Sequence, residues 1–230
     1  MRIGVIVAME KELSRLVTLL DDTRSERHGG RTFVRGTACG KEIVLQQCGI
    51  GKVNSAVGAT EMINVYHPDI IISTGVAGGA DISLNVCDTV VATECRYHDA
   101  YCGKECEYGQ IIGMPASFVT DSRLVDAALS LHCSPRVRAG MIVSGDCFVD
   151  SRERMADILR RFPDALAVDM ESCSIAQTCH IYGIPFVSFR IISDIPLKDD
   201  NVSQYFDFWQ RLADSSFDVT RKYLEEVNEE

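Results

Sequence analysis

The sequence predicts an α/β fold in a single domain of 230 residues. Short apolar runs of strand length alternate with longer segments of helical pattern, and this alternation continues to the C-terminal end. Such alternation is typical of a sheet whose faces are covered by helices. A chain of this length can bury a substantial core, and no repeat, low-complexity tract or linker divides it. We therefore expect residues 1–230 to form one domain.

The predicted elements follow one another closely. Strands are expected at 2–8, 43–48, 69–74, 87–93, 137–143, 165–169 and 185–192, and helices at 9–21, 53–66, 121–132, 151–162, 170–182 and 202–227. A further apolar run before Gly36 predicts a hairpin over 31–48. The helix at 170–182 has a clear end, because Gly183 supplies a left-handed cap and Pro185 cannot continue a helix.

Charge and hydropathy exclude several classes of partner. The chain has 33 acidic and 23 basic residues, a formal net charge of -10, which repels nucleic-acid phosphates and anionic membrane surfaces. The apolar run at the start is too short for a signal peptide or a membrane span. We expect a cytoplasmic protein that binds neither nucleic acid nor membranes.

The ten cysteines are spread along the chain without a Cys-x-x-Cys pair, the close spacing that zinc sites normally need. Most are interpreted as free thiols that behave as small hydrophobes, including those in Gln47-Cys48-Gly49 and Asp146-Cys147-Phe148. Cys102 and Cys106 lie in a polar loop and are less readily interpreted. His98-Asp99 has no third ligand spaced nearby. The sequence therefore predicts reduced thiols, no metal and no other cofactor.

Acids and glycines gather at the carboxyl ends of the predicted strands, where open α/β sheets bind their ligands. Glycines there permit tight turns or the close approach of a ligand. The two glycine stretches, Gly49 to Lys52 and Gly75 to Gly79, lack the dinucleotide-binding and P-loop patterns. Glu10 and Glu12 point about 200° apart on a helix, so at most one faces a cleft. Each acid alone has an ordinary structural explanation. Glu12 could be a first-turn acid favoured by the helix dipole, and Asp194 could be a solvated turn residue. Their joint placement at separate strand ends favours a ligand site.

Taken together, these strand exits resemble, in order and almost end to end, those of the 5′-methylthioadenosine/S-adenosylhomocysteine nucleosidases of the nucleoside phosphorylase superfamily. The resemblance implies a three-layer α/β/α fold with a central mixed, partly barrel-like sheet. It also implies a homodimer with shared pockets, and hydrolysis of the N-glycosidic bond of an adenine nucleoside. The matching segments are Ile3 to Glu12, Cys48 to Val53, Pro68 to Gly79, Arg96 to Asp99, Glu107 to Gln110, Val143 to Asp146, Val168 to Glu171 and Arg190 to Asp194.

The resemblance also implies a role for each matched residue. Asp194 would protonate N7 of adenine while Ser193 orients its carboxyl group, which needs a raised pKa or a proton held by hydrogen bonds. Glu12 would activate the attacking water with Arg190 nearby, and Glu171 would bind the ribose hydroxyls. Phe148 would stack on the base, whose edge is read by backbone groups of Phe148 and Val149. The other implied substrate-binding residues are Met9, Ile50, Met170 and Phe206, on the sugar and 5′ side, together with Ala8, Val76, Ala77 and Gly78.

Departures from the family pattern bear on specificity. Val76 stands where these nucleosidases usually carry a serine, and the arginines with which related phosphorylases bind phosphate are also missing, so water is the expected nucleophile. The loop over 101–107 is one residue short and has Lys104 and Cys106 at the positions of two aromatic residues. Ile112 replaces a proline, and Asp169 replaces the usual glutamate, which is a milder change. The loop leaves the preferred 5′ substituent open.

Two alternatives remain at this stage. A phosphate-dependent nucleoside phosphorylase would need phosphate for turnover and would yield a sugar phosphate. A nucleoside-binding sensor would keep the pocket without catalysis. Retention of Glu12, Glu171, Arg190 and Asp194 argues against a sensor, because a protein that only binds needs no paired acid and base.

Overall fold

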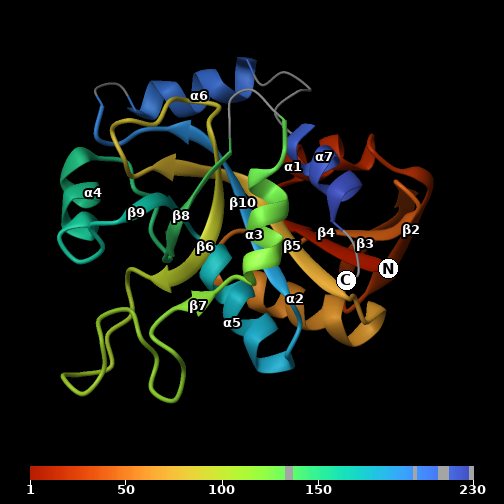
Figure 1. Cartoon of the computed structure of the whole chain (residues 1–230), viewed down its shortest axis with the longest axis horizontal. Helices are drawn as coiled ribbons and strands as arrows, with labels where there is room; N and C mark the ends of the chain where they lie inside the picture. Colours follow the sequence, from red (N-terminus) through yellow and green to blue (C-terminus); the bar gives the residue numbers. More distant parts are fainter. Residues whose placement is uncertain (133–136, 199–200, 212–217, 228–230) are drawn as a thin grey trace.

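The structure is a computed structural model that describes residues 1–132, 137–198, 201–211 and 218–227. A twisted, mixed ten-stranded sheet runs through the described part of the chain, with helices packed against it (Figure 1). Its strands are β1 (Arg2–Val7), β2 (Asp21–His28), β3 (Arg31–Ala38), β4 (Lys41–Gln47), β5 (Ile70–Gly79), β6 (Thr89–Tyr97), β7 (Phe118–Val119), β8 (Val137–Ser144), β9 (Ala165–Asp169) and β10 (Phe186–Asp194).

The sheet has a closed part and an open part. Neighbouring strands of the closed part are β10, β6, β8, β9 and β5, and a parallel pairing of β10 with β5 completes a five-stranded ring. The open part continues from β5 through β1, β4, β3 and β2. The partly barrel-like mixed sheet expected from the sequence is confirmed.

Helices cover both faces of this sheet. In the described residues they are α1 (Glu10–Val17), α2 (Lys52–Tyr66), α3 (Ser122–Leu129), α4 (Arg152–Leu159), α5 (Ser172–Tyr182), α6 (Asn201–Arg211) and α7 (Asp218–Glu226). One core cluster joins α1, α3 and α7 to the sheet through Leu16, Val125 and Tyr223. A second joins α2 and α5 to it through Met62 and Ile175. Since burying a large apolar side chain contributes about 1.5–3 kcal/mol, these clusters fix the three layers.

β10 shows how the sequence encodes a central strand that ends in a functional site. All nine of its residues are buried, and its apolar run has no alternation because helices cover both faces of the sheet. Three polar residues near its end, Arg190, Ser193 and Asp194, are buried with the rest. Buried polar groups require partners, so these side chains must enter a polar network.

Two features near the N-terminus differ from the sequence prediction. The helix expected over 9–21 ends at Val17, and β2 begins at Asp21. β2 was missed because it is polar on both faces and exposed along almost its whole length, so no alternation signals a strand. Its charges suit an edge strand, where they discourage pairing with another chain. Farther along the chain, the two-residue strand β7 was also not predicted.

Other boundaries are close to prediction. The hairpin over 31–48 is confirmed, with Ala38 facing Lys41 across the turn between β3 and β4. The helix expected from 170 begins at Ser172, after Glu171 as its N-cap residue. The helix expected over 202–227 consists of α6 and α7, and residues 212–217 between them lie outside the described residues. Within the described residues, every helix is too short or too polar to cross a bilayer.

Candidate active site

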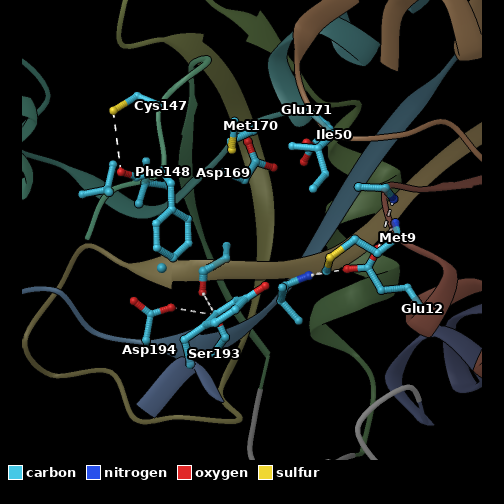
Figure 2. Close-up of a pocket in the computed structure, with 17 residues that line it drawn as sticks. Met9, Glu12, Ile50, Cys147, Phe148, Asp169, Met170, Glu171, Ser193 and Asp194 are labelled. Atoms are coloured by element: carbon cyan, nitrogen blue, oxygen red, sulfur yellow. Dashed lines mark hydrogen bonds between the residues drawn. The ribbon is translucent and has the colours of Figure 1, made fainter. Parts of the chain in front are cut away.

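A pocket lies at the carboxyl ends of β1, β5, β9 and β10, where the sequence predicted a ligand site (Figure 2). It holds about 640 Å³ of free space, including its mouth. Every strand exit that carries a predicted site residue contributes to its wall. The lining residues are Ala8, Met9, Glu12, Ile50, Val76, Ala77, Gly78, Cys147, Phe148, Val149, Val168, Asp169, Met170, Glu171, Ser193, Asp194 and Tyr205.

Glu12 lies in the first turn of α1 and is almost completely buried. Its Oε2 accepts the backbone N–H groups of Ala8 at 3.0 Å and Met9 at 2.9 Å, and its Oε1 accepts that of Val76 at 3.1 Å. Burial raises the pKa of Glu12, while these N–H groups and the Arg190 cation oppose the rise. The carboxyl group is therefore fixed in orientation and is a stronger base than an exposed glutamate.

Gly75 allows Glu12 and Arg190 to meet across β5. A Cβ atom added to Gly75 would lie 2.6 Å from Oε1 of Glu12 and 3.1 Å from Nη1 of Arg190. A side chain at this position would displace the carboxyl or guanidinium group from its place. The sequence left this glycine open between a tight turn and the close approach of a ligand, and the structure gives it a packing requirement at the site.

Arg190 is held beneath the pocket by a buried polar network. Its Nε donates to Oδ2 of Asp169 at 2.5 Å, and its Nη2 donates to Oγ of Ser73 at 2.9 Å. Burial opposes the Arg190 cation, but the Asp169 and Glu171 carboxyl groups outweigh it and keep the pKa of Arg190 above its ordinary value. Asp169 also accepts from Oγ of Ser144 at 2.5 Å and from the hydroxyl of Ser172. The guanidinium group therefore lies in one fixed orientation.

Glu171 follows β9 and occupies the N-cap position of α5. Its Oε1 accepts the backbone N–H of Gly51 at 2.8 Å, which links it to the segment before α2. Burial, followed by the neighbouring Asp169 carboxylate, raises the pKa of Glu171 to about 7. The carboxyl group can therefore change its charge near neutral pH.

Asp194 is the last residue of β10 and is buried at the pocket wall. Its Oδ1 accepts from Oγ of Ser193 at 2.7 Å, and the same hydroxyl lies 3.2 Å from the carbonyl oxygen of Ala77. Figure 2 shows Asp194 and Ser193 on the side of the pocket nearer Phe148, with Glu12 on the opposite side. A ligand between them would meet a carboxyl group from each direction.

An aromatic wall stands beside Asp194. The half-exposed ring of Phe148 contacts Tyr205 of α6 edge to face, with 5.5 Å between ring centroids. Tyr205 lines the pocket, whereas Phe206, the residue expected from the sequence, is largely exposed. The expected site otherwise comes together: its remaining substrate-binding residues line the pocket, and Arg190 lies directly behind its wall.

Four lining residues were absent from the predicted set: Cys147, Val168, Asp169 and Tyr205. Three of them are neighbours of predicted residues at the same strand exits, which is the signal that could have identified them. Tyr205 and Phe206 are adjacent aromatic residues, and their order in the sequence does not show which one faces the sheet. Of the serines that donate to Asp169, Ser172 lies three residues later at the start of α5, whereas Ser144 comes from β8 and is brought there only by the fold.

The site can perform acid–base chemistry on a small, partly apolar ligand. Two buried carboxyl groups face one pocket, one from the first turn of α1 and one from the end of β10, and a third has a pKa near neutrality. An aromatic ring offers a stacking surface for a flat group beside one of these acids. Such a constellation suits the cleavage of a bond between a planar leaving group and a hydroxylated ring.

Comparisons with known proteins agree with this geometry. The family model described as phosphorylase superfamily matches residues 2–225. The 5′-methylthioadenosine/S-adenosylhomocysteine nucleosidase of Desulfotalea psychrophila is 40% identical over 232 residues, covering 100% of this chain and 99% of that protein.

Two solved structures have the same fold. The S-adenosylhomocysteine nucleosidase of Streptococcus pyogenes, in complex with 5-methylthiotubericidin, superposes with a TM-score of 0.93 at 32% identity, covering 100% of this chain and 98% of that one. The 5′-methylthioadenosine/S-adenosylhomocysteine nucleosidase of Colwellia psychrerythraea, in complex with adenine, gives 0.89 at 35% identity, with 100% and 98% covered. This chain belongs to the phosphorylase superfamily and, within it, to the 5′-methylthioadenosine/S-adenosylhomocysteine nucleosidases.

Proposed function

We propose that this protein hydrolyses the N-glycosidic bond of 5′-methylthioadenosine and S-adenosylhomocysteine and releases adenine. The observation that carries the proposal is the placement of two buried carboxyl groups, Asp194 and Glu12, in one pocket with an aromatic wall beside Asp194. The relatives described above are named for these substrates. Two of them have solved structures, one in complex with adenine and one in complex with 5-methylthiotubericidin.

Asp194 is the proposed general acid. Adenine leaves as a neutral molecule only if a proton reaches it, and Asp194 would deliver that proton to N7 as the C1′–N9 bond breaks. A serine hydroxyl has one donor and two acceptor positions. Ser193 therefore donates to Asp194 when that group is ionised, and can donate to Ala77 and accept from Asp194 when it is protonated. The contact suits both states of an acid that gives up its proton.

Glu12 is the proposed general base. It would take a proton from the water whose oxygen forms the new bond to C1′, and the three backbone N–H groups leave its carboxylate no freedom to turn away. A base is more effective when its pKa approaches the working pH, and burial shifts Glu12 in that direction. Arg190 lies beside it and would stabilise the ionised form.

Glu171 is the proposed ribose-binding group. An ionised carboxylate accepts hydrogen bonds from two neighbouring hydroxyls, whereas a protonated one loses part of that capacity. With a pKa of about 7, Glu171 should limit activity on the acid side of neutrality. Met9, Ile50 and Met170 provide apolar contacts for the sugar and its 5′ substituent.

The charges of the pocket favour water over phosphate as the nucleophile. Its lining, which lies wholly in the described part of the chain, contains four acidic residues and no lysine or arginine. The guanidinium group of Arg190 donates to Asp169 and Ser73, and the side chain of Val76, beside Glu12, has no hydrogen-bond donor for phosphate. A phosphate dianion would face carboxyl groups without a free cation to bind it. This favours a hydrolase over a phosphorylase.

A homodimer is the proposed assembly. Ile50, Val53 and Val57 expose 52%, 75% and 41% of their surfaces around the start of α2, and Ile50 also lines the pocket. A second copy packed on this patch would bury apolar surface and cover one side of the pocket. Light scattering should give twice the mass of the chain; the mass of a single chain would contradict the dimer.

A cytoplasmic location is the proposed setting. The nine cysteines in the described residues, all but Cys133, are free thiols. Burial raises the pKa of Cys48 to about 12, so this thiol stays protonated and unreactive. Unpaired thiols of this number fit a reducing compartment.

Product analysis tests the proposed reaction. The purified protein would be incubated with methylthioadenosine in phosphate-free buffer, and adenine and sugar products would be separated by chromatography. Adenine with free methylthioribose supports the hydrolase. A requirement for phosphate would make the protein a phosphorylase, and binding without adenine release would make it a sensor. The same assay with S-adenosylhomocysteine ranks the two 5′ substituents.

A further inference from the structure

Three charged residues outside the pocket connect three separate segments at its rim. Lys52 begins α2, Asp99 follows β6, and Asp146 follows β8. The ammonium group of Lys52 contacts both oxygens of Asp99, at 2.9 Å from Oδ1 and 2.8 Å from Oδ2. The backbone N–H of Asp146 donates to Asp99, and that of Lys52 donates to Asp146, each at 2.8 Å. We refer to this closed ring of Lys52, Asp99 and Asp146 as the rim clamp.

The backbone is packed closely around the rim clamp. A Cβ atom added to Gly145 would lie 2.4 Å from Cε1 of the buried His98 and 2.8 Å from Cγ of Asp99. Only glycine allows the exit of β8 to approach the exit of β6 this closely. The Lys52 ammonium group also lies 5.4 Å from the ring centroid of Tyr97, a cation–π distance. The contacts of the rim clamp thus belong to a packed junction of three elements.

The electrostatics of the rim clamp hold it in its charged form. Burial disfavours the Asp99 carboxylate, but the Lys52 ammonium group and the Asp146 N–H outweigh it and keep the pKa of Asp99 below its ordinary value. The contact of one ammonium group with both carboxylate oxygens is charge-assisted, and about a quarter of each side chain is exposed to solvent. The rim clamp is therefore stronger than an open surface ion pair, which contributes about 0–1 kcal/mol.

Two members of the rim clamp, Lys52 and Asp146, adjoin different parts of the pocket. Gly51, the residue before Lys52, donates its N–H to Glu171. Phe148, two residues after Asp146, lines the pocket on the side of Asp194. The clamp residues themselves do not line the pocket in the described structure. Any influence on a ligand must therefore pass through Gly51 and the Phe148 segment.

We propose that the rim clamp is a positioning network for the proposed hydrolysis. It holds the Gly51 N–H on Glu171 and the Phe148 segment beside Asp194, so that ribose and base are bound in one register. The three residues are positioning residues, since none touches the reacting atoms. The inference rests on the proposed function, and it adds a determinant of activity that lies outside the pocket.

A specific consequence follows from the groups around Glu171. The protonated form of Glu171 is favoured by burial and by the carboxyl groups of Asp169 and Glu12. The ionised form is favoured by Arg190 and by the N–H of Gly51. The neighbouring Cys48 thiol is protonated at neutral pH and adds no charge. Weakening the rim clamp misaligns the Gly51 N–H and so raises the pKa of Glu171 further. Activity should then be lost more severely at acidic than at alkaline pH.

The test compares Lys52→Met and Asp99→Asn with the wild-type protein. Both variants keep the side-chain shape and remove one charge of the rim clamp. We expect kcat/KM for methylthioadenosine to fall about tenfold at about pH 8.5 and further at about pH 6, with the acidic limb of the pH profile moved to higher pH. Lys52→Arg, which keeps the charge, should recover much of the loss.

Arg138→Met is the matched control. Arg138 is similarly exposed, pairs with Asp81 at 3.4 Å, and lies near the start of β8, away from the end of that strand at the pocket. This variant should leave kcat/KM and the acidic limb unchanged. Circular dichroism and thermal unfolding of each variant show whether a loss of kcat/KM comes from misfolding. If it does, Lys52→Arg and Asp99→Asn are compared at a lower temperature.

The outcomes separate the two proposals. Unchanged kcat/KM in folded Lys52→Met and Asp99→Asn, or a uniform loss with an unmoved acidic limb, would overturn the rim clamp while leaving the hydrolase intact. If the wild-type protein binds methylthioadenosine without cleaving it, the hydrolase fails and the same comparison of affinities across pH decides the rim clamp. A wild-type protein that does neither contradicts both.

Discussion

Asp194 shows how much of a residue's role depends on its surroundings. In the sequence it precedes Ile195-Pro196, as a solvated turn aspartate would, yet it is buried with a serine partner at the pocket wall. Glu12 is likewise an ordinary first-turn glutamate in sequence, and the structure places three backbone N–H groups on its carboxylate. The positions could be predicted from strand exits, and the Ser193 partner was expected through the family resemblance; the burial and the contacts with Val76 and Ala77 could not be predicted, because they depend on segments distant in sequence.

Replacement of the proposed acid should separate binding from chemistry. Asp194→Asn keeps the shape of the side chain and the contact with Ser193 but has no proton to deliver. We expect kcat to fall by about 10²- to 10⁴-fold while adenine affinity, measured by calorimetry, changes little. Turnover equal to that of the wild-type protein would remove Asp194 from the mechanism.

Replacement of the proposed base should have a similar kinetic effect for a different reason. In Glu12→Gln, the amide oxygen still accepts the N–H groups on one side, the amide NH2 group faces the N–H donor on the other side, and the side chain cannot take a proton from water. We expect kcat to fall by about 10²- to 10⁴-fold, as followed by adenine release. If the rate is unchanged, another group must activate the water.

Glu171 should show opposite effects on stability and activity. Its pKa rises from the ordinary carboxyl range to about 7 on folding, so the folded state binds the proton more tightly and loses stability as the pH rises through this interval. Glu171→Gln should therefore raise the melting temperature at about pH 8, by an amount that shrinks as the pH falls toward about 5, and should weaken nucleoside binding. A melting temperature below that of the wild-type protein at about pH 8 would show that the ionised group stabilises the fold.

At the scale of elements, the site depends on how β9 and β10 are held together behind it. Asp169 at the end of β9 and Arg190 in β10 form an ion pair that is almost fully buried, supported by serines from β5, β8 and α5. Buried pairs of this kind lose much of their charge attraction to desolvation, but an unpaired buried charge is strongly unfavourable. The pair therefore fixes geometry more than it adds stability.

Breaking that pair should destabilise the fold. Asp169→Asn removes the carboxylate that accepts from the buried Arg190 guanidinium group, and we expect a loss of about 3–5 kcal/mol in the free energy of unfolding, measured with urea. Asp157→Asn is the matched control, because Asp157 pairs with Arg160 in an exposed position and should change stability by about 0–1 kcal/mol. Equal, small effects in both variants would mean that the buried network relaxes around the lost charge.

Elements differ in how well their sequences predict them. β1 and β10 are buried on both faces, so their apolar runs identify them directly. β2 lies at the exposed edge and carries alternating charges with no apolar face, so its sequence contains no strand signal. The contribution of Tyr205 in place of Phe206 depends on how α6 rotates against β10, a tertiary property that two adjacent aromatic residues do not reveal.

At the scale of the whole molecule, the closed ring of strands explains why one pocket receives residues from so many segments. Pairing β10 with β5 closes the ring so that the exits of β5, β9 and β10 line one pocket, and the turn from β1 into α1 adds Glu12 from the open part of the sheet. The alternating α/β pattern predicts the layers, but the closure depends on long-range pairing that composition and periodicity do not contain. It was expected here only through resemblance to a family.

Water, and not phosphate, is the proposed nucleophile at the anomeric carbon. The most direct measurement is to supply methylthioadenosine in ¹⁸O-labelled water with phosphate present and to determine the mass of the sugar product. We expect methylthioribose that carries one ¹⁸O atom beside free adenine, because Glu12 directs a water molecule to C1′ and the pocket lacks a free cation for phosphate in its described lining. Methylthioribose 1-phosphate without the label would contradict it.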